Sequence, residues 1–108
     1  MSSTFPLEIN PDPTEMGVLK PGQQAELKIV LRNPGREPIA IRRIETSCPC
    51  VQVAPVMFRV GPGEVKSLAV RFDPSDEPDF RGELSVIVTG YDGEARVAFA
   101  NRVNLEVR

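Results

Sequence analysis

The only two cysteines of the chain are separated by a single residue, in the stretch Cys48-Pro49-Cys50. Three interpretations follow from this spacing. The thiols can pack as small apolar groups, they can close a disulfide in an oxidising compartment, or they can bind a soft ion such as Cu(I) or zinc as thiolates. Cys48 and Cys50 are therefore candidate metal ligands and a candidate disulfide, and all three interpretations stay open at this point.

Geometry and composition constrain these interpretations. In an extended chain the Cα atoms of residues two apart lie roughly 6.5–7 Å from each other, at the far end of the range for disulfides, so a bond requires a turn at Pro49. A metal site would have two thiolates and no histidine, with Met57 the nearest other sulfur. Arg42 and Arg43 lie upstream and would favour the thiolate form if the fold brought them close.

Other catalytic chemistry finds little support in the sequence. Histidine is absent, which removes imidazole acid–base chemistry and leaves Ser47 without a histidine to activate it. An acidic stretch offers oxygen ligands but lacks the spacing of an EF-hand, so we expect a solvated loop. Its carboxylates belong to Asp73, Asp76, Glu77 and Asp79. No glycine-rich phosphate loop occurs, and no carboxylate pair is marked out by its neighbours. The sequence predicts no enzyme and no cofactor.

Charge and hydropathy limit the partners. The chain has 13 basic and 15 acidic residues, a net charge of −2, and the two signs are interspersed. Nucleic-acid binding requires clustered basic residues, so we expect no nucleic-acid partner. The apolar stretches are far shorter than the roughly 20 residues that span a bilayer, and no export signal opens the chain at Met1-Ser2-Ser3-Thr4.

The elements that must position the cysteines are strands. Eleven prolines and eight glycines recur along the 108 residues and would interrupt helices of ordinary length. The stretches between them alternate apolar and polar residues with a period of two, as half-buried strands do. These stretches are residues 23–32, 37–45, 51–53, 56–60, 65–72, 83–89 and 95–107. About seven short strands separated by turns predict an all-β, antiparallel sandwich, and residues 1–108 are expected to form a single domain.

Several local features follow from the same pattern. Residues 5–10 should form an edge strand because the neighbouring prolines cannot donate to a central ladder. Broken parity at Arg42-Arg43 predicts a bulge, the last strand should kink at residues 100–102, and Asp92-Gly93 predicts a hairpin. The most deeply buried positions are expected to be Ile29, Ile41, Val70, Val86 and Phe99.

The order of several short motifs carries a family resemblance. They are Leu31-Arg32-Asn33-Pro34-Gly35, Thr46-Ser47-Cys48-Pro49-Cys50, Pro55, Gly61-Pro62-Gly63-Glu64 and Arg71-Phe72-Asp73-Pro74. Together they resemble the bacterial family called domain of unknown function 1573, over residues 14–90. The resemblance implies an immunoglobulin-like sandwich related to sperm-protein, ciliary and pilus-chaperone modules, in exported or envelope proteins without an assigned activity. Pro49 and Val51 depart from the Gly and Thr of the family pattern.

These observations lead to two hypotheses for the function. The first is a non-catalytic structural or protein-interaction module that reaches a protein partner through a sheet edge or a loop end, outside the cytoplasm in the periplasm or cell envelope. The second is a thiol-dependent module that binds a soft metal ion or does redox chemistry through Cys48 and Cys50. The sequence predicts neither the identity of the partner nor the oligomeric state.

Overall fold

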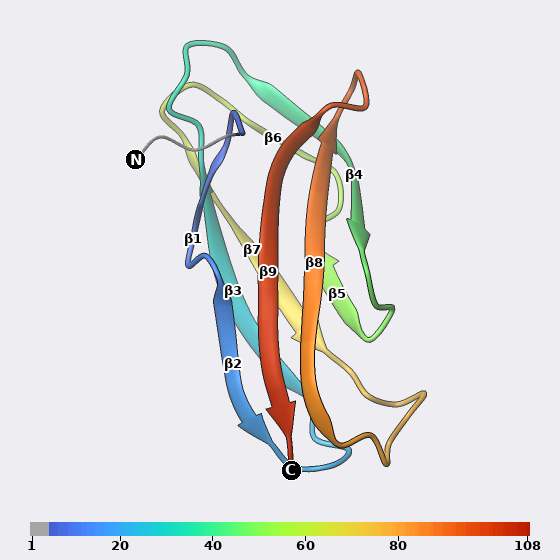
Figure 1. Ribbon diagram of the computed structural model, residues 1–108. Helices are drawn as coiled ribbons and strands as arrows, with labels where there is room; N and C mark the ends of the chain where they lie inside the picture. Colours follow the sequence, from blue (N-terminus) through green and yellow to red (C-terminus); the bar gives the residue numbers. More distant parts are fainter. Residues whose placement is uncertain (1–4) are drawn as a thin grey trace.

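The computed structural model describes residues 5–108, so the opening Met1-Ser2-Ser3-Thr4 lies outside the described residues. The regular elements in this range are strands (Figure 1). They are β1 (Glu8–Asn10), β2 (Thr14–Leu19), β3 (Ala25–Arg32), β4 (Ile39–Thr46), β5 (Val51–Ala54), β6 (Phe58–Val60), β7 (Val65–Phe72), β8 (Gly82–Asp92) and β9 (Val97–Val107). None of the elements within residues 5–108 is a helix that could cross a membrane.

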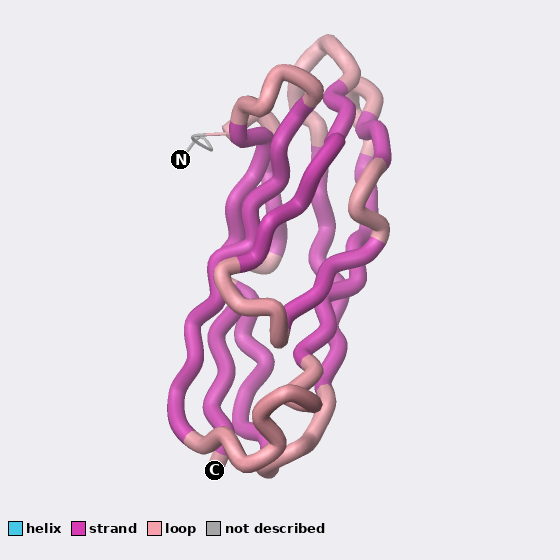
Figure 2. The backbone as a smooth tube through the Cα atoms, turned by 90° about the vertical axis from the view of Figure 1, so that its right-hand side faces the viewer, coloured by secondary structure: helices cyan, strands magenta, loops and turns pink. Residues whose placement is uncertain are grey.

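The strands form two sheets that pack face to face, and they run along the long axis of the molecule (Figure 2). One sheet has the order β1-β3-β7-β5 and the other the order β2-β9-β8-β4-β6. The predicted all-β sandwich is therefore confirmed. Two details differ from the prediction: the described residues form nine strands instead of about seven, and β2 pairs with β9 in parallel.

The strand β2 was not predicted because residues 14–19 show no regular alternation of apolar and polar residues. Thr14 and Leu19 are both buried although they have opposite parity. The pairing with β9 shifts register between Glu15 and Val18, where Gly17 has a φ of 81°. A bulge of this kind places side chains of both parities on the same face, so no alternation was visible in the sequence.

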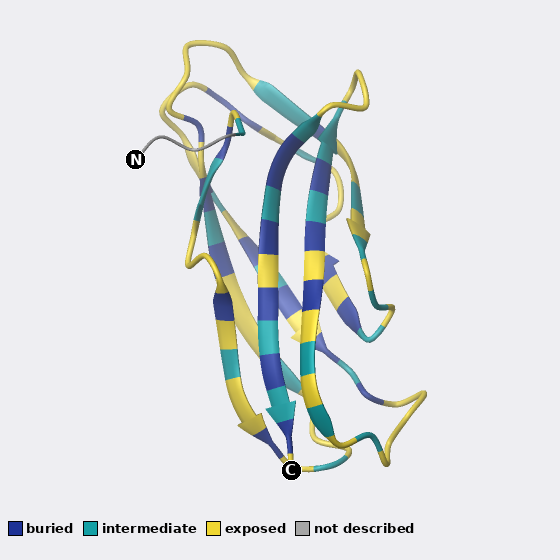
Figure 3. Ribbon diagram, viewed as in Figure 1, coloured by how far each residue is buried: buried dark blue, intermediate teal, exposed yellow. Residues whose placement is uncertain are grey.

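The core lies between the two sheets, and buried residues alternate with less buried ones along β5, β7, β8 and most of β9 (Figure 3). The five positions expected to be most deeply buried are at most 1% exposed, which confirms the predicted parity: Ile29, Ile41, Val70, Val86 and Phe99. Leu27 shares the inward parity of β3 but is 38% exposed. β1 pairs with β3 only at residues 30–32, so β3 has no neighbour on that side at Leu27.

Both long strands of the second sheet contain irregularities. The predicted bulge in β4 is confirmed by a register shift between Ile41 and Arg43. In β9 the irregularity lies at Ala98, between the pairs Gly90–Phe99 and Tyr91–Val97, and not at residues 100–102 as predicted. Ala98 and Phe99 are consequently both buried although they are adjacent.

The predicted hairpin at Asp92 joins β8 to β9 and is held by one carboxylate. Asp92 Oδ1 accepts hydrogen bonds from the backbone N–H groups of Glu94 and Arg96, each at 2.9 Å. The bond from the Arg96 N–H is the main reason why the pKa of Asp92 lies below its ordinary value. Ala95 takes the positive φ of 60° that closes the turn.

At the same end of the molecule a buried side chain joins the β3–β4 connection to β6. Asn33 is 0% exposed, and its amide nitrogen donates to the carbonyl oxygens of Glu37, at 2.8 Å, and Val60, at 3.0 Å. Its Oδ1 accepts a bond from the N–H of Gly35 at 2.9 Å. The side chain therefore supplies hydrogen bonds to backbone groups of the β3–β4 connection and of β6, which do not pair with each other in a sheet at this point.

Candidate functional site

The structure joins Cys48 and Cys50 in a disulfide within the short connection between β4 and β5. A turn at Pro49 brings the two Cα atoms to 5.2 Å, within the ordinary range for a disulfide. Both cysteines are half-buried and pack against the core. The structure thus has the second of the three arrangements considered above. The redox state of the protein in solution stays a prediction.

Backbone hydrogen bonds fix this connection on both sides. Ser47 pairs with Ile87 of β8, donating its N–H at 3.0 Å and accepting from the Ile87 N–H through its Oγ at 2.9 Å. On the other side, the carbonyl oxygen of Cys50 accepts from the N–H of Asp73 at 2.7 Å. The disulfide is therefore clamped between the two sheets rather than carried on a free loop.

A small cavity lies beside the disulfide because β8, in one sheet, extends beyond the point where the β5–β7 pair of the other sheet ends. Val51 of β5 pairs with Phe72 at the end of β7, whereas β8 extends to Gly82. The inner face of β8 at Leu84 is consequently covered by the β7–β8 connection, residues 73–81, and not by a strand. The cavity there has a volume of about 230 Å³.

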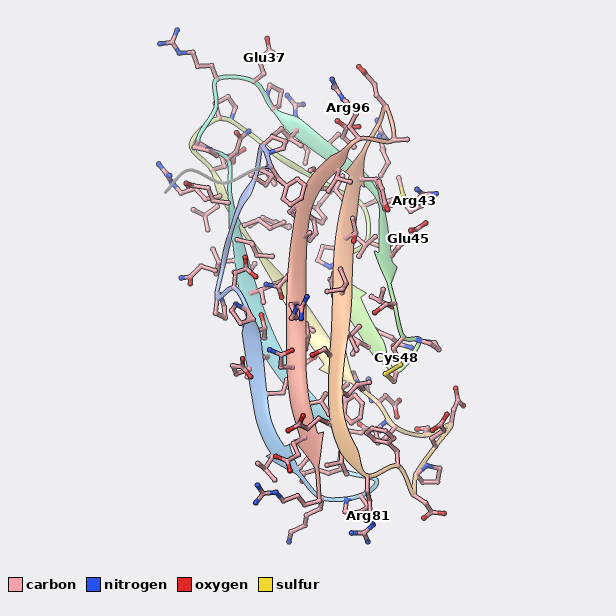
Figure 4. All side chains as sticks on the ribbon, viewed as in Figure 1. Glu37, Arg43, Glu45, Cys48, Arg81 and Arg96 are labelled. Carbon is pink, nitrogen blue, oxygen red and sulfur yellow. A yellow bond between two sulfur atoms is a disulfide. The ribbon has the colours of Figure 1, made fainter. Side chains whose placement is uncertain are left out.

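We call this cavity the disulfide pocket. Its apolar walls are the disulfide itself and the side chains of Pro49, Phe72, Pro74, Phe80 and Leu84. Phe72 is 2% exposed and forms the deep part, whereas Pro49 is exposed. Figure 4 shows the disulfide, labelled at Cys48, at the side of the sandwich where β5 begins.

Three carboxylates complete the lining of the disulfide pocket, and no basic side chain does. They belong to Asp73, Asp76 and Glu77 of the β7–β8 connection. Hydrogen bonds from the Oγ and N–H of Ser75 hold the pKa of Asp73 below its ordinary value. Asp76 and Glu77 are exposed.

The acidic residues do not form a metal centre. Within residues 5–108, no group of three or more Cys, Asp or Glu side chains is arranged to hold a metal ion. Sulfur atoms that are bonded to each other also offer no thiolate to a soft ion. The acidic stretch was predicted as a solvated loop. The structure adds that three of its four carboxylates border an apolar cavity, while Asp79 does not.

The disulfide pocket adjoins the edge strand β5. Hydrogen bonds alternate in direction along an antiparallel pair, and the bond from Asp73 to Cys50 sets the phase. Gln52 and Ala54 therefore direct their backbone groups toward β7, and Val53 directs its N–H and C=O toward the open side. In the sheet order β5 has a neighbour on one side only.

The other residues considered from sequence lie away from the disulfide. The guanidinium of Arg43 stacks 4.4 Å from the ring centroid of Tyr91 and is 3.5 Å from a Glu45 oxygen. Figure 4 shows Arg43 and Glu45 on β4, above Cys48, which follows the end of that strand. Met57 is 59% exposed in the β5–β6 connection, beyond the far end of β5. Neither is placed to activate or complete a thiol site.

The predicted edge strand at residues 5–10 is present as β1, at the end of its sheet. Nothing in the sequence indicated that Phe80 and Leu84 line the disulfide pocket. Leu84 lies in the stretch 83–89 that was predicted as a strand, but the sequence carries no signal that the opposite sheet ends before reaching it.

Comparisons with known proteins agree with this fold. The family model described as HYDIN/CFA65/VesB-like, Ig-like domain matches residues 6–99. This match covers most of the 108 residues, so the chain belongs to this family of immunoglobulin-like domains. Comparison with curated protein sequences gives no match.

Solved structures resemble the chain in fold at low sequence identity. The PapD-like domain 7 of human CEP192 superposes with a TM-score of 0.71 at 12% identity, over 100% of this chain and 90% of that one. A Porphyromonas gingivalis W83 protein of unknown function gives a TM-score of 0.76 at 20% identity, over 93% of this chain and 46% of that one. The secreted serine protease VesC from Vibrio cholerae gives 0.67 at 10% identity, over 96% of this chain and 23% of that one.

Proposed function

We propose that this domain is a non-catalytic module that binds another protein by accepting a strand of that protein at the open edge of β5. The observation that carries the proposal is the chemistry of the edge strands. Sheets with open edges usually prevent unwanted pairing with charged residues, prolines, bulges or very short strands. An edge without charge is suited to add a strand from a partner.

Three of the four terminal strands of the described sheets carry such protection. β1 has three residues, including Glu8, which forms an ion pair with Arg32 at 2.7 Å. β2 contains Glu15 and the bulge at Gly17. β6 has three residues, including Arg59. By contrast, the four residues of β5 read Val-Gln-Val-Ala and contain no charge and no proline.

Other features support the same proposal. The net charge of −2 disfavours nucleic acid, and the matched family is one of immunoglobulin-like domains, a fold that binds partners through edges and loops in many proteins. Within the proposal, residues 1–108 act as one module. The similarity to the secreted VesC and to the periplasmic chaperone SfaE, at a TM-score of 0.61 and 15% identity, favours a place outside the cytoplasm. The narrower resemblance to the bacterial family of domain 1573 rests on the motifs alone.

Site-specific photo-crosslinking tests the proposal. A photoreactive residue is introduced at Gln52, on β5, and in a matched control at Lys28, an exposed charged position on β3 of the same sheet, where the neighbouring Glu26 also opposes strand addition. We expect a protein to be captured from Gln52 and not from Lys28, and mass spectrometry then identifies both the protein and the linked segment.

The captured protein is then purified and its affinity measured directly. The double variant Gln52→Lys with Ala54→Lys places two charges on exposed positions of the edge and should weaken binding, because charged side chains oppose strand addition. Equal capture from Gln52 and Lys28, or full affinity of the double-lysine variant, would refute the proposal.

A further inference from the structure

We propose that the disulfide pocket is an anchor site for one bulky aliphatic side chain of a protein partner, leucine or methionine, flanked in the partner by lysine or arginine. This inference deepens the proposed function and rests on it, since the anchor residue would belong to the segment that pairs with β5. The pocket lies where β5 begins: Cys50 directly precedes the strand, and Phe72 pairs with its first residue, Val51.

The size of the cavity indicates what it holds. An apolar cavity of about 150 Å³ accommodates a benzene molecule, whereas sites for cofactors and drug-sized ligands occupy about 300–1,000 Å³. At about 230 Å³ the disulfide pocket suits one large side chain and is too small for a nucleotide or a flavin. Its walls of proline, phenylalanine, leucine and disulfide sulfur offer an apolar surface and few polar partners.

The charge around the cavity indicates what should flank that side chain. Asp73, Asp76 and Glu77 border the pocket without a neighbouring basic residue in its lining. Asp73, like any aspartate, is ionised at neutral pH, and one of its oxygens accepts two hydrogen bonds from Ser75. A lysine or arginine next to the anchor would neutralise this rim, whereas an acidic neighbour would be repelled. An aliphatic residue between basic residues therefore fits the pocket better than an acidic or purely apolar segment.

The geometry of β5 favours a peptide over a free small molecule. A partner strand that pairs with the open side of Val53 would run toward the β4–β5 connection, where Pro49 lines the pocket. The Val51 N–H there is already bonded to the Cys48 carbonyl oxygen at 3.1 Å, so the partner would leave the ladder at this point, beside the pocket. Side chains on such a strand alternate, so one residue can point into the pocket while its neighbours meet the carboxylates. Backbone pairing would supply affinity, and the pocket would select the sequence.

Nuclear magnetic resonance titration of the whole oxidised protein with three short peptides tests the inference. The probes are five-residue peptides, capped at both ends, with the sequences Gly-Lys-Leu-Arg-Gly, Gly-Lys-Ala-Arg-Gly and Gly-Glu-Leu-Glu-Gly. We expect the first to shift the amide signals of Cys48, Cys50, Phe80 and Leu84. The alanine peptide should bind at least about tenfold more weakly, because it lacks the buried aliphatic group.

Charge variants provide the matched comparison. Asp76→Asn with Glu77→Gln removes two exposed carboxylates at the pocket and should weaken the Gly-Lys-Leu-Arg-Gly peptide about 3- to 10-fold at low salt. Glu37→Gln with Glu94→Gln removes the same charge from the loops at the opposite end of a molecule 46 Å long and should leave the affinity unchanged. Figure 4 shows Glu37 at that end.

Each alternative outcome of the titration overturns the inference. If all three peptides bind alike and shift only the amides of β5, the edge accepts strands but the pocket does not select among them, so the proposed function stands and the anchor site fails. If the basic leucine peptide leaves the pocket signals unmoved, the anchor site also fails, and the crosslinking at Gln52 decides the proposed function separately. Equal weakening by the two double variants would show that only net charge matters.

Discussion

Replacing Gly90 with alanine would test how tightly the two central strands of the larger sheet pack. Gly90 of β8 lies opposite Phe99 of β9 in the register. A Cβ atom built on Gly90 would lie 2.6 Å from Cζ of the Phe99 ring and closer still to Cε2. Phe99 is 0% exposed, so its ring has no solvent-filled space into which it can turn.

The sign of the effect follows from two opposing contributions. A glycine-to-alanine change in ordinary backbone stabilises a protein by about 0.4–1 kcal/mol, because it restricts the unfolded chain. Forcing a methyl group into a packed core costs about 1–3 kcal/mol. Because the Cβ atom meets the body of a buried aromatic ring and not the end of a flexible chain, we expect the second contribution to dominate. The net loss in the free energy of unfolding should be about 1–2 kcal/mol.

Urea and thermal denaturation of the oxidised protein measure this loss. For a domain of this size, about 1 kcal/mol lowers Tm by roughly 4–8 °C. Gly93→Ala is the matched control in the neighbouring hairpin, since its Cβ would lie 3.9 Å from the nearest atoms, which belong to Arg42. This control should change the stability by less than about 0.5 kcal/mol.

A second substitution separates steric conflict from other causes. Phe99→Leu shortens the ring side chain and costs stability by itself, but it removes the atoms that the new methyl group would meet. The double variant should therefore be more stable than the sum of the single effects predicts. Wild-type stability of Gly90→Ala, or strict additivity in the double variant, would show that the register opposite Phe99 has been assigned wrongly.

Three further predictions concern the hairpin end and the disulfide. Asn33→Ala should lower the free energy of unfolding by about 2–3 kcal/mol, because it leaves buried backbone carbonyls without donors, whereas Asn10→Ala at an exposed position should not. The pKa of Asp92 is lower in the folded protein than in the unfolded chain, so the ionised carboxylate stabilises the fold above the unfolded pKa, and this stabilisation is lost as the pH falls through the folded pKa. Asp92→Asn should therefore lose less stability than the wild type below about pH 4. Acid titrations followed by circular dichroism measure the difference. Reduction of the disulfide should raise the intact mass by two hydrogen atoms, and Cys48→Ser with Cys50→Ser should lower the free energy of unfolding by about 1–2 kcal/mol, because the loop that the disulfide closes is very short. In a metal-uptake assay the reduced protein should bind neither zinc nor Cu(I) stoichiometrically. Stoichiometric uptake would support the thiol-dependent alternative instead.

Alternation along the chain was sufficient to predict most of the fold. It assigned the inward parity of β3, β7, β8 and β9 and the burial of Ile29, Val70 and Phe99, because a period of two can arise only where one face of a strand is buried. It failed where the backbone departs from that period. The bulge in β2 interrupts the alternation, so this strand was not predicted. In β9 the bulge lies at Ala98, whereas the kink was predicted at residues 100–102. The parallel pairing of β2 with β9 depends on contacts between the two ends of the chain, which no local pattern encodes.

The candidate site was less accessible to sequence reasoning. Cys48 and Cys50 stood out by type and spacing, and the acidic stretch after Asp73 stood out by composition. Nothing in the sequence indicated that these two features, more than 20 residues apart, share one cavity. Their proximity results from the antiparallel pairing of β5 with β7, which places Val51 beside Phe72. The segment before Val51, with the cysteines, and the segment after Phe72, with the carboxylates, therefore lie at the same end of this strand pair.

The unequal lengths of the strands explain why an open edge and an apolar pocket occur together. β5 has four residues and covers only the last part of β7, while β8 has eleven. Before β5 begins, the chain crosses from one sheet to the other in four residues, 47–50, and the disulfide lies within this crossing. A partner segment that pairs with β5 therefore reaches the pocket without spanning a loop, so the two weak contacts act on one ligand. Two such contacts joined in one chain bind more tightly than either alone, because the second forms at a high effective concentration.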